Sequence, residues 1–233
     1  MTSWKNNNTL YSMRETNERK VVAKDKSHLE ELIKTRVSAE GPNCDLNDID
    51  VSRITDMSYL FYAAAEDFNG DISQWDVSNV RNMADMFYRC KFNGDISGWD
   101  VSNVRNMSSM FCRSRFSGDI SHWDVSNVTD MSDMFHASKF NGDISNWNVS
   151  NVENMRAMFF DAEFDGDISN WDVSNVKSMW LMFMGSNFSG DLSKWNVSEE
   201  ASLSEMFWGS RVKGKRRPAW YVDWIHKHPR SKH

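Results

Sequence analysis

The sequence predicts an α/β fold: a solenoid of about seven stacked coils of 24 residues, with a helix before it and a basic, aromatic segment after it. Two observations carry this prediction. Tryptophan recurs at intervals of 24 residues, and each interval repeats the same order of glycine, acidic and apolar residues. The tryptophans are Trp75, Trp99, Trp123, Trp147, Trp171 and Trp195.

Each unit has an extended half followed by a half with helical spacing. It reads Gly-Asp-Ile-Ser-x-Trp-Asp-Val-Ser-Asn-Val and, after one variable residue, Asn-Met-x-x-Met-Phe. In the first half, Ile96 and Val101 are residue types that favour β-strands. In the second half, Met107, Met110 and Phe111 fall at i, i+3 and i+4, which is the spacing of a helical turn. We therefore expect a short strand and a short helical turn in every coil.

The predicted solenoid extends over residues 46–212. A degenerate first copy begins at Leu46, and a two-residue insertion between Ala64 and Asp67 delays the second copy. The last copy carries Glu200 in place of a valine and Val212 in place of a phenylalanine. One unit cannot bury its apolar residues alone, so the coils must stack. At ~4.8 Å per coil, seven coils give a body roughly 33 Å long.

The flanking segments are predicted to cover the two ends of the solenoid. Residues 1–26 are polar and are expected to be flexible. Residues 27–45 are predicted to form a capping helix, since Ser27 and Glu30 have the spacing of a capping box. Residues 213–233 form a basic segment in which Trp220 and Trp224 are expected to dock on the last coil.

The charge is distributed unevenly along the chain. Residues 45–210 carry 11 Lys and Arg against 26 Asp and Glu, a net charge of −15. Residues 211–233 carry 8 Lys and Arg against one acidic residue, a net charge of +7. An acidic body repels nucleic acid, while a basic tail attracts it. Nucleic acid is therefore not an expected partner of the solenoid, and it stays open for the tail.

The cysteines and the absence of long apolar runs bear on the compartment. Cys44, Cys90 and Cys112 have neither a disulfide framework nor the spacing of a zinc site. The first 26 residues contain no apolar run of the kind found in signal peptides or lipid anchors, and no stretch of the chain is long enough to span a bilayer. We expect a cytoplasmic protein, or a surface protein if an export signal has been removed.

The repeat from Asp95 to Phe111 resembles the bacterial surface-protein repeat of the BspA-like leucine-rich-repeat family, which is also described as a mycoplasma-type repeat of unknown function. The resemblance covers roughly 165 residues. It implies a right-handed, leucine-rich-repeat-like solenoid and a role in adhesion and protein binding. It supplies no catalytic residues.

The aspartates that follow glycine form a column along the predicted solenoid. We interpret them as structural, because an aspartate in a turn accepts N–H bonds from the backbone two residues on. A calcium ladder is the alternative, although the unit lacks a second Gly-Asp turn to complete it. The column consists of Asp71, Asp95, Asp119, Asp143, Asp167 and Asp191.

The sequence gives no support for catalysis. It shows no nucleophile with a neighbouring base and no glycine-rich phosphate loop. His226 and His228 in the basic tail lack a carboxylate or thiol that would complete a ligand set. We expect no enzyme activity, no metal and no cofactor.

Departures from the repeat in its later copies indicate a binding surface, because variable positions on a fixed scaffold are where recognition is encoded. Positions that are small or polar in earlier copies become large and apolar. These residues are predicted to form one exposed cluster, which we call the late-coil patch: Phe160, Trp180, Leu181, Met184 and Trp208. A protein partner, the C-terminal segment of the chain itself, and scattered exposure remain open as interpretations.

The leading functional hypothesis is a non-enzymatic protein-interaction module that binds through the late-coil patch or through its acidic face. Two other hypotheses remain open. One is an acidic inhibitor that mimics nucleic acid and occupies a DNA- or RNA-binding protein. The other is a fragment of an adhesin. The identity of the partner and the oligomeric state do not follow from the sequence.

Overall fold

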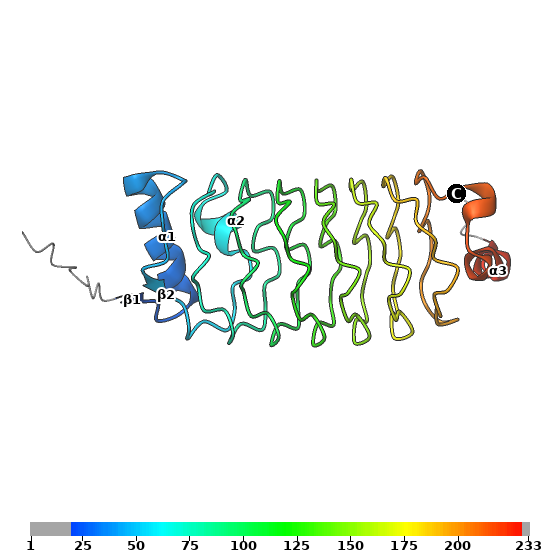
Figure 1. Cartoon of the computed structure of the whole chain (residues 1–233), viewed down its shortest axis with the longest axis horizontal. Coiled ribbons are helices and arrows are strands. Elements are labelled where there is room, and N and C mark those ends of the chain that lie inside the picture. The colour runs from blue at the N-terminus through cyan, green and yellow to red at the C-terminus, as the bar shows by residue number, and fades with distance from the viewer. Residues whose placement is uncertain (1–19, 230–233) are drawn as a thin grey trace, which may run out of the picture.

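The computed structural model describes residues 20–229, except for the side chain of Lys215. Coils of backbone stand side by side in a row between α1 at one end and α3 at the other (Figure 1). The helices and strands are short and few: β1 (Val21–Val22), α1 (Lys26–Glu40), β2 (Ile49–Asp50), α2 (Leu60–Ala64), the 3-10 helix η1 (Gly214–Arg216) and α3 (Ala219–Lys227). Most of the chain between α2 and η1 is therefore ordered by contacts between coils.

Neighbouring coils are joined by a ladder of backbone hydrogen bonds. The ladder occupies the same eight-residue stretch of each repeat, and we number these ladder segments 1 to 7: 56–63, 82–89, 106–113, 130–137, 154–161, 178–185 and 202–209. In segment 2, the N–H groups of Met83, Asp85 and Phe87 donate to carbonyl oxygens of segment 3 over 2.8–3.0 Å. Parallel bridges link the first residues of successive segments throughout the row.

The predicted helical turn is wrong for coils 2 to 7, where this stretch forms the ladder. Within segment 2, the N–H groups of Met86 and Tyr88 donate three residues back, while alternate N–H groups leave the coil for the next one. Asp85 and Arg89 take up left-handed φ angles of 56°. A helix this short is marginal by itself, whereas a ladder gains bonds from both neighbouring coils. Only coil 1 contains a helix here, α2, next to the two-residue insertion.

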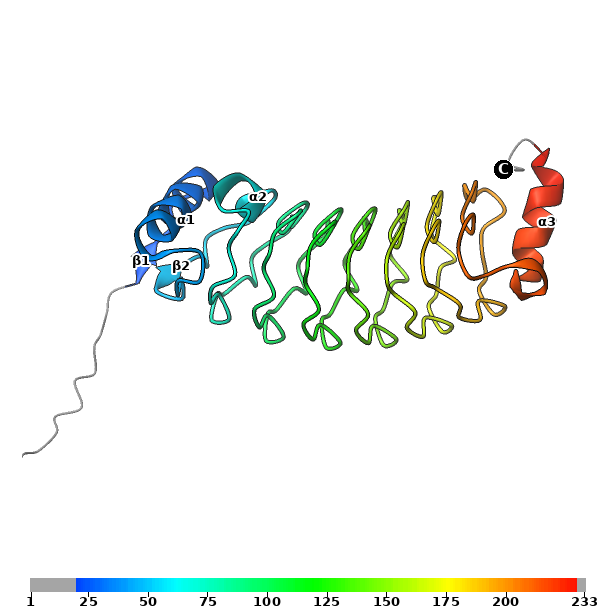
Figure 2. The same cartoon turned by 90° about the horizontal axis from the view of Figure 1, so that it is seen from above.

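The core consists of columns of identical side chains. Phenylalanines of the ladder segments stack with ring centroids 5.2–5.9 Å apart in the column of Phe61, Phe87, Phe111, Phe135, Phe159, Phe183 and Phe207. A second phenylalanine column, from Phe68 to Phe188, has spacings of 6.0–6.4 Å. The ring spacings in both columns exceed the ~4.8 Å expected between adjacent strands. The coils fan out away from the ladder, and Figure 2 shows them closer together on the side of α2.

Each tryptophan of the repeat forms a hydrogen bond to the preceding coil. All six are 4% exposed. The Nε1–H group of Trp123 donates to the carbonyl oxygen of Ile96 over 3.2 Å, and the other five make the equivalent bond to a Leu or Ile carbonyl. The indole nitrogen therefore has its partner inside the core, where an unpaired N–H would be costly.

The N-terminal end is covered by α1 and β1. Leu29 and Ile33 of α1 are fully buried. β1 pairs in parallel with β2. Part of the predicted flexible segment 1–26 is therefore ordered. Residues 1–19 of that segment lie outside the described residues. The predicted capping box is wrong: the helix begins one residue earlier, and the Asp25 carboxylate accepts the N–H of His28 over 2.9 Å.

The C-terminal end is covered by α3, which reproduces the repeat's tryptophan contact. Trp220 stacks on Trp195 with centroids 6.4 Å apart, and its Nε1–H donates to the carbonyl oxygen of Leu192 over 2.9 Å. Trp224 donates likewise to the carbonyl oxygen of Ala201, and Tyr221 packs edge-on against Phe207. A helix thus supplies the next tryptophan of the column without supplying another coil.

We predict that Trp123→Ala lowers the free energy of unfolding by ~3–5 kcal/mol, because it leaves a large cavity and an unpaired Ile96 carbonyl. The same change at Trp220, which is only partly buried, should cost less. Denaturant melts of both variants measure the difference. Equal losses would contradict the distinction between core and cap.

Removal of residues 218–233 should lower the melting temperature and promote end-to-end association. The deletion removes the side chains that cover Trp195 and Phe207. These residues adjoin a ladder edge where, within residues 20–229, the N–H groups of Glu205 and Gly209 already lack a backbone acceptor. An uncovered edge of this kind pairs readily with another chain. Light scattering and thermal melts test the prediction, which fails if the truncated protein stays monomeric with an unchanged melt.

Candidate interaction surface

The ladder segments form one face of the row, on which the outward side chains vary from coil to coil. The inward positions of segment 5, Met155, Met158 and Phe159, are fully buried like their equivalents in other coils. The third, seventh and eighth positions, such as Arg156, Phe160 and Asp161, vary in residue type along the row. Folding fixes the first group of positions and leaves the second group available for recognition.

The structure brings the late-coil patch together on this face. Trp180 is 38% exposed and Trp208 50% exposed, while Phe160, Leu181 and Met184 are half-buried. Backbone bonds place the residues in register: the N–H of Asp161 donates to the carbonyl oxygen of Met184, and the N–H of Gly185 to that of Trp208, both over 2.8 Å. The patch therefore extends across three neighbouring coils, 5 to 7.

A polar network holds the edge of the patch in place. The Asp133 carboxylate contacts His136 Nδ1 at 3.0 Å and Arg156 Nη1 at 2.6 Å. The Arg156 guanidinium lies over the ring of Trp180, 5.0 Å from its centroid. The rings of His136 and Phe160 pack together with their centroids 4.7 Å apart. These contacts restrict the rotamers of two aromatic residues before any partner arrives, which reduces the entropy lost on binding.

The described part of the C-terminal segment, up to residue 229, does not cover the patch. The described part of that segment packs on the end of the row, against Trp195 and Phe207, and Trp208 stays half exposed. Of the interpretations left open by the sequence, packing of the patch against the chain's own tail has no contact to support it within residues 20–229.

Sequence reasoning missed three tyrosines at the other end of the same face. Tyr59 and Tyr62 are 49% and 44% exposed. The rings of Tyr62 and Tyr88 pack edge-on with their centroids 5.2 Å apart. The signal was present, because Tyr62 and Tyr88 occupy the seventh ladder position, as Phe160 does. All exposed large aromatic residues of the described chain lie on the ladder segments: Tyr59, Tyr62, Trp180 and Trp208.

Gly209 opens the surface beside Trp208. It has φ of +71°, but Arg113, Ala137 and Asp161 adopt φ angles of 50–56° at the same position of their coils. The backbone conformation therefore does not require glycine. A Cβ at Gly209 would meet only the backbone of Gly185, at an ordinary 3.5 Å. Nothing within the described chain demands glycine here, and its effect is to leave backbone accessible next to the aromatic ring.

The column of aspartates after glycine forms turns. Each carboxylate accepts the N–H of the serine two residues on, over 2.8–2.9 Å, as Asp143 does from Ser145. These bonds to the ionised form hold the pKa of all six carboxyl groups below the usual range. Within residues 20–229, no three His, Cys, Asp or Glu side chains are grouped so as to hold a metal ion.

The glycine before each of these aspartates is required by close packing. A Cβ on Gly142 would lie 2.9 Å from the ring of Phe140, and the other repeats show the same approach. The phenylalanine ring thus packs directly on the glycine backbone at the start of the turn, and it leaves no room for a side chain there.

Two comparisons with known proteins gave no match, and one did. No curated protein and no solved structure matches the chain. The model of the DUF285 family, described as a Mycoplasma protein of unknown function, matches twice, over residues 28–136 and 112–220. The two matches together include the whole row of coils. The chain belongs to this family. The DUF285 match confirms a mycoplasma-type repeat protein and assigns it no function.

The cysteines of this DUF285 chain are buried free thiols. Burial raises the pKa of Cys90 to about 11. Burial, together with the nearby charge of Asp133, raises the pKa of Cys112 to about 12. Thiols that remain protonated near neutral pH are poor nucleophiles. None of the helices within residues 20–229 is long and apolar enough to cross a membrane.

The aspartate turns predict a loss of stability in acid. Their carboxyl groups titrate near pH 3.9 when unfolded and lower when folded. The unfolded state therefore binds more protons in this range. The stabilisation is fully present above about pH 4 and disappears as the pH falls through the lower, folded pKa values.

Urea unfolding at a series of acidic pH values measures this dependence. Asp143→Asn keeps the hydrogen-bond acceptor, as Asn148 shows by accepting the N–H of Ser150, and removes one titrating group. Its stability should depend less steeply on pH than that of the wild type. Identical slopes would show that the turn carboxylates do not contribute.

Proposed function

We propose that the protein is a non-enzymatic scaffold that binds a partner protein through the late-coil patch. The observation that carries the proposal is the exposure of Trp180 and Trp208 on a face whose inward residues are nearly constant from coil to coil. Binding energy at protein interfaces concentrates in a few Trp, Tyr and Arg residues near the centre of the contact. The patch provides two tryptophans, and Arg156 and the accessible backbone of Gly209 lie beside them.

The finer classification is part of the same proposal. We propose a right-handed, leucine-rich-repeat-like solenoid of the BspA type, on the basis of the repeat motif and its parallel stacked coils. Protein binding is what that resemblance implies. The three buried cysteines form no disulfide with one another, which fits a reducing compartment, and we propose the cytoplasm.

The test compares two matched variants of the full chain. Trp208→Ala removes a half-exposed ring from the patch, and Tyr59→Ala removes an equally exposed ring, 49% against 50%, from the opposite end of the face. Proteins captured from the native host by the wild type and by Tyr59→Ala, but not by Trp208→Ala, are the expected partners. For such a partner we expect Trp208→Ala to weaken binding by about 2 kcal/mol, roughly thirtyfold, in calorimetry.

Two outcomes would contradict the proposal. Partners retained by Trp208→Ala would place the contact elsewhere. A partner that binds nucleic acid and dissociates steeply with rising salt, without regard to Trp208, would favour an acidic inhibitor that mimics nucleic acid.

A further inference from the structure

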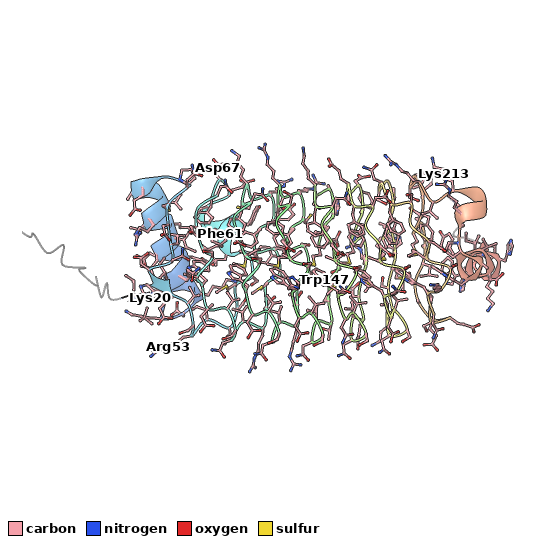
Figure 3. The ribbon with its side chains drawn as sticks, in the orientation of Figure 1. Lys20, Arg53, Phe61, Asp67, Trp147 and Lys213 are labelled. Atoms are coloured by element: carbon pink, nitrogen blue, oxygen red, sulfur yellow. The ribbon has the colours of Figure 1, made fainter. Side chains whose placement is uncertain are left out.

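Five cationic side chains gather along one edge of coils 2 to 4. They occupy the eighth ladder position and the position two residues beyond it, and we call them the basic corner: Arg89, Lys91, Arg113, Arg115 and Lys139. All five are exposed. Lys91 bonds Asp67 at 2.6 Å, and Figure 3 shows Asp67 on the long edge opposite to Arg53. The N–H of Arg89 donates to the carbonyl oxygen of Cys112, so coils 2 and 3 are in direct contact there.

The fold does not require arginine at the eighth ladder position, which Arg89 and Arg113 occupy. The eighth ladder position also accepts Ala137, Asp161 and Gly209 with the same left-handed backbone. Within residues 20–229, neither Arg113 nor Arg115 forms an ion pair, although the body has a net charge of −15. Arg89 likewise forms no ion pair within the described residues, so three exposed arginines without an acidic partner lie at this edge of a body with a net negative charge.

Tyrosines lie next to these cations. The Arg89 guanidinium is 5.4 Å from the ring centroid of Tyr88, and Tyr88 meets Tyr62 at 5.2 Å. A tyrosine offers an apolar ring and a hydroxyl group that can donate or accept. The corner can thus hold both the charged and the uncharged parts of a peptide.

The corner is short and is bounded by acidic residues at both ends. Coil 1 contributes Glu66 and Asp67, and coil 5 contributes Asp161 and Glu163, all exposed. Three coils extend over roughly 15 Å at the usual strand spacing. A long polyanion such as nucleic acid would continue into these carboxylates and be repelled. A short acidic segment of a protein would end before reaching them.

We propose that the basic corner binds an acidic peptide segment of a protein partner. Carboxylates of the segment pair with Arg89, Arg113 and Arg115, because the guanidinium fork matches a carboxylate in two parallel hydrogen bonds. An apolar side chain of the segment packs on Tyr62 and Tyr88. This surface is separate from the late-coil patch, and the proposal does not depend on it.

The experiment measures binding of a fluorescein-labelled hexaglutamate peptide by fluorescence anisotropy at low salt, where exposed charges are least screened. We expect the full chain to bind it and the triple variant Arg89→Glu, Arg113→Glu, Arg115→Glu to bind about tenfold more weakly or worse. The matched control reverses three exposed arginines of the opposite edge, Arg53, Arg81 and Arg105, and changes the net charge equally. It should stay within about twofold of the wild type.

Thermal melts verify that both triple variants are folded, and Arg113→Gln, with an expected loss of about threefold, replaces the triple variant if that protein does not fold. Trp208→Ala should bind the peptide normally, which separates this test from that of the late-coil patch. Equal losses in the two triple variants would overturn the proposal in favour of diffuse attraction. Loss only on charge reversal at Lys213 and Arg216 would assign binding to the tail. Tighter binding of oligothymidylate at the same arginines would make the corner a nucleic-acid surface.

Discussion

The register of the backbone ladder is the constraint on which the rest of the molecule depends. Alternate N–H groups of one ladder segment must meet carbonyl oxygens of the next, so each segment needs the same length and the same inward residues. The residue types of Met107, Met110 and Phe111 therefore recur with little change at the equivalent positions of the other coils. The one insertion, near Glu66, falls after the ladder segment of coil 1, where a longer connection does not shift the register. Left-handed residues such as Asp85 are tolerated because ladder bonds on both sides offset their strain.

A row of coils has two ends, and the two are covered differently. At the N-terminal end α1 buries Leu29 and Ile33, and β1 adds a parallel strand to β2. At the C-terminal end Trp220 takes the place of the next repeat tryptophan and forms the same type of bond to a carbonyl oxygen. The tryptophan column thus ends on Trp220, whose indole N–H bonds the Leu192 carbonyl oxygen, while α3 covers the end of the row. A helix has no free edge along its length, which makes it a suitable terminus for stacked coils.

Much of this organisation could be predicted from the sequence, because the period and the apolar positions follow directly from the tryptophans and methionines. The backbone between those positions could not. Met107, Met110 and Phe111 have the same spacing whether they line a helical turn or a ladder segment, and the choice between them depends on hydrogen bonds to neighbouring coils. The same limit applied to the surface. The late-coil patch stood out because Trp180 departs from the repeat, whereas nothing in the sequence alone shows that the ring of Tyr62 is exposed.

The outward residues of the ladder face change in a definite order along the row. The tyrosines lie in coils 1 and 2 and the cations in coils 2 to 4. Asp161 and Glu163 follow in coil 5, and the exposed rings of Trp180 and Trp208 lie in coils 6 and 7. Because successive coils are a fixed step apart, this order presents unlike chemistries at set distances. A partner long enough to reach from Arg113 to Trp208 can satisfy both surfaces in one direction only, since reversal would place its acidic groups against Asp161. Polarity of this kind contributes specificity independently of affinity, through the repulsion that the wrong orientation meets.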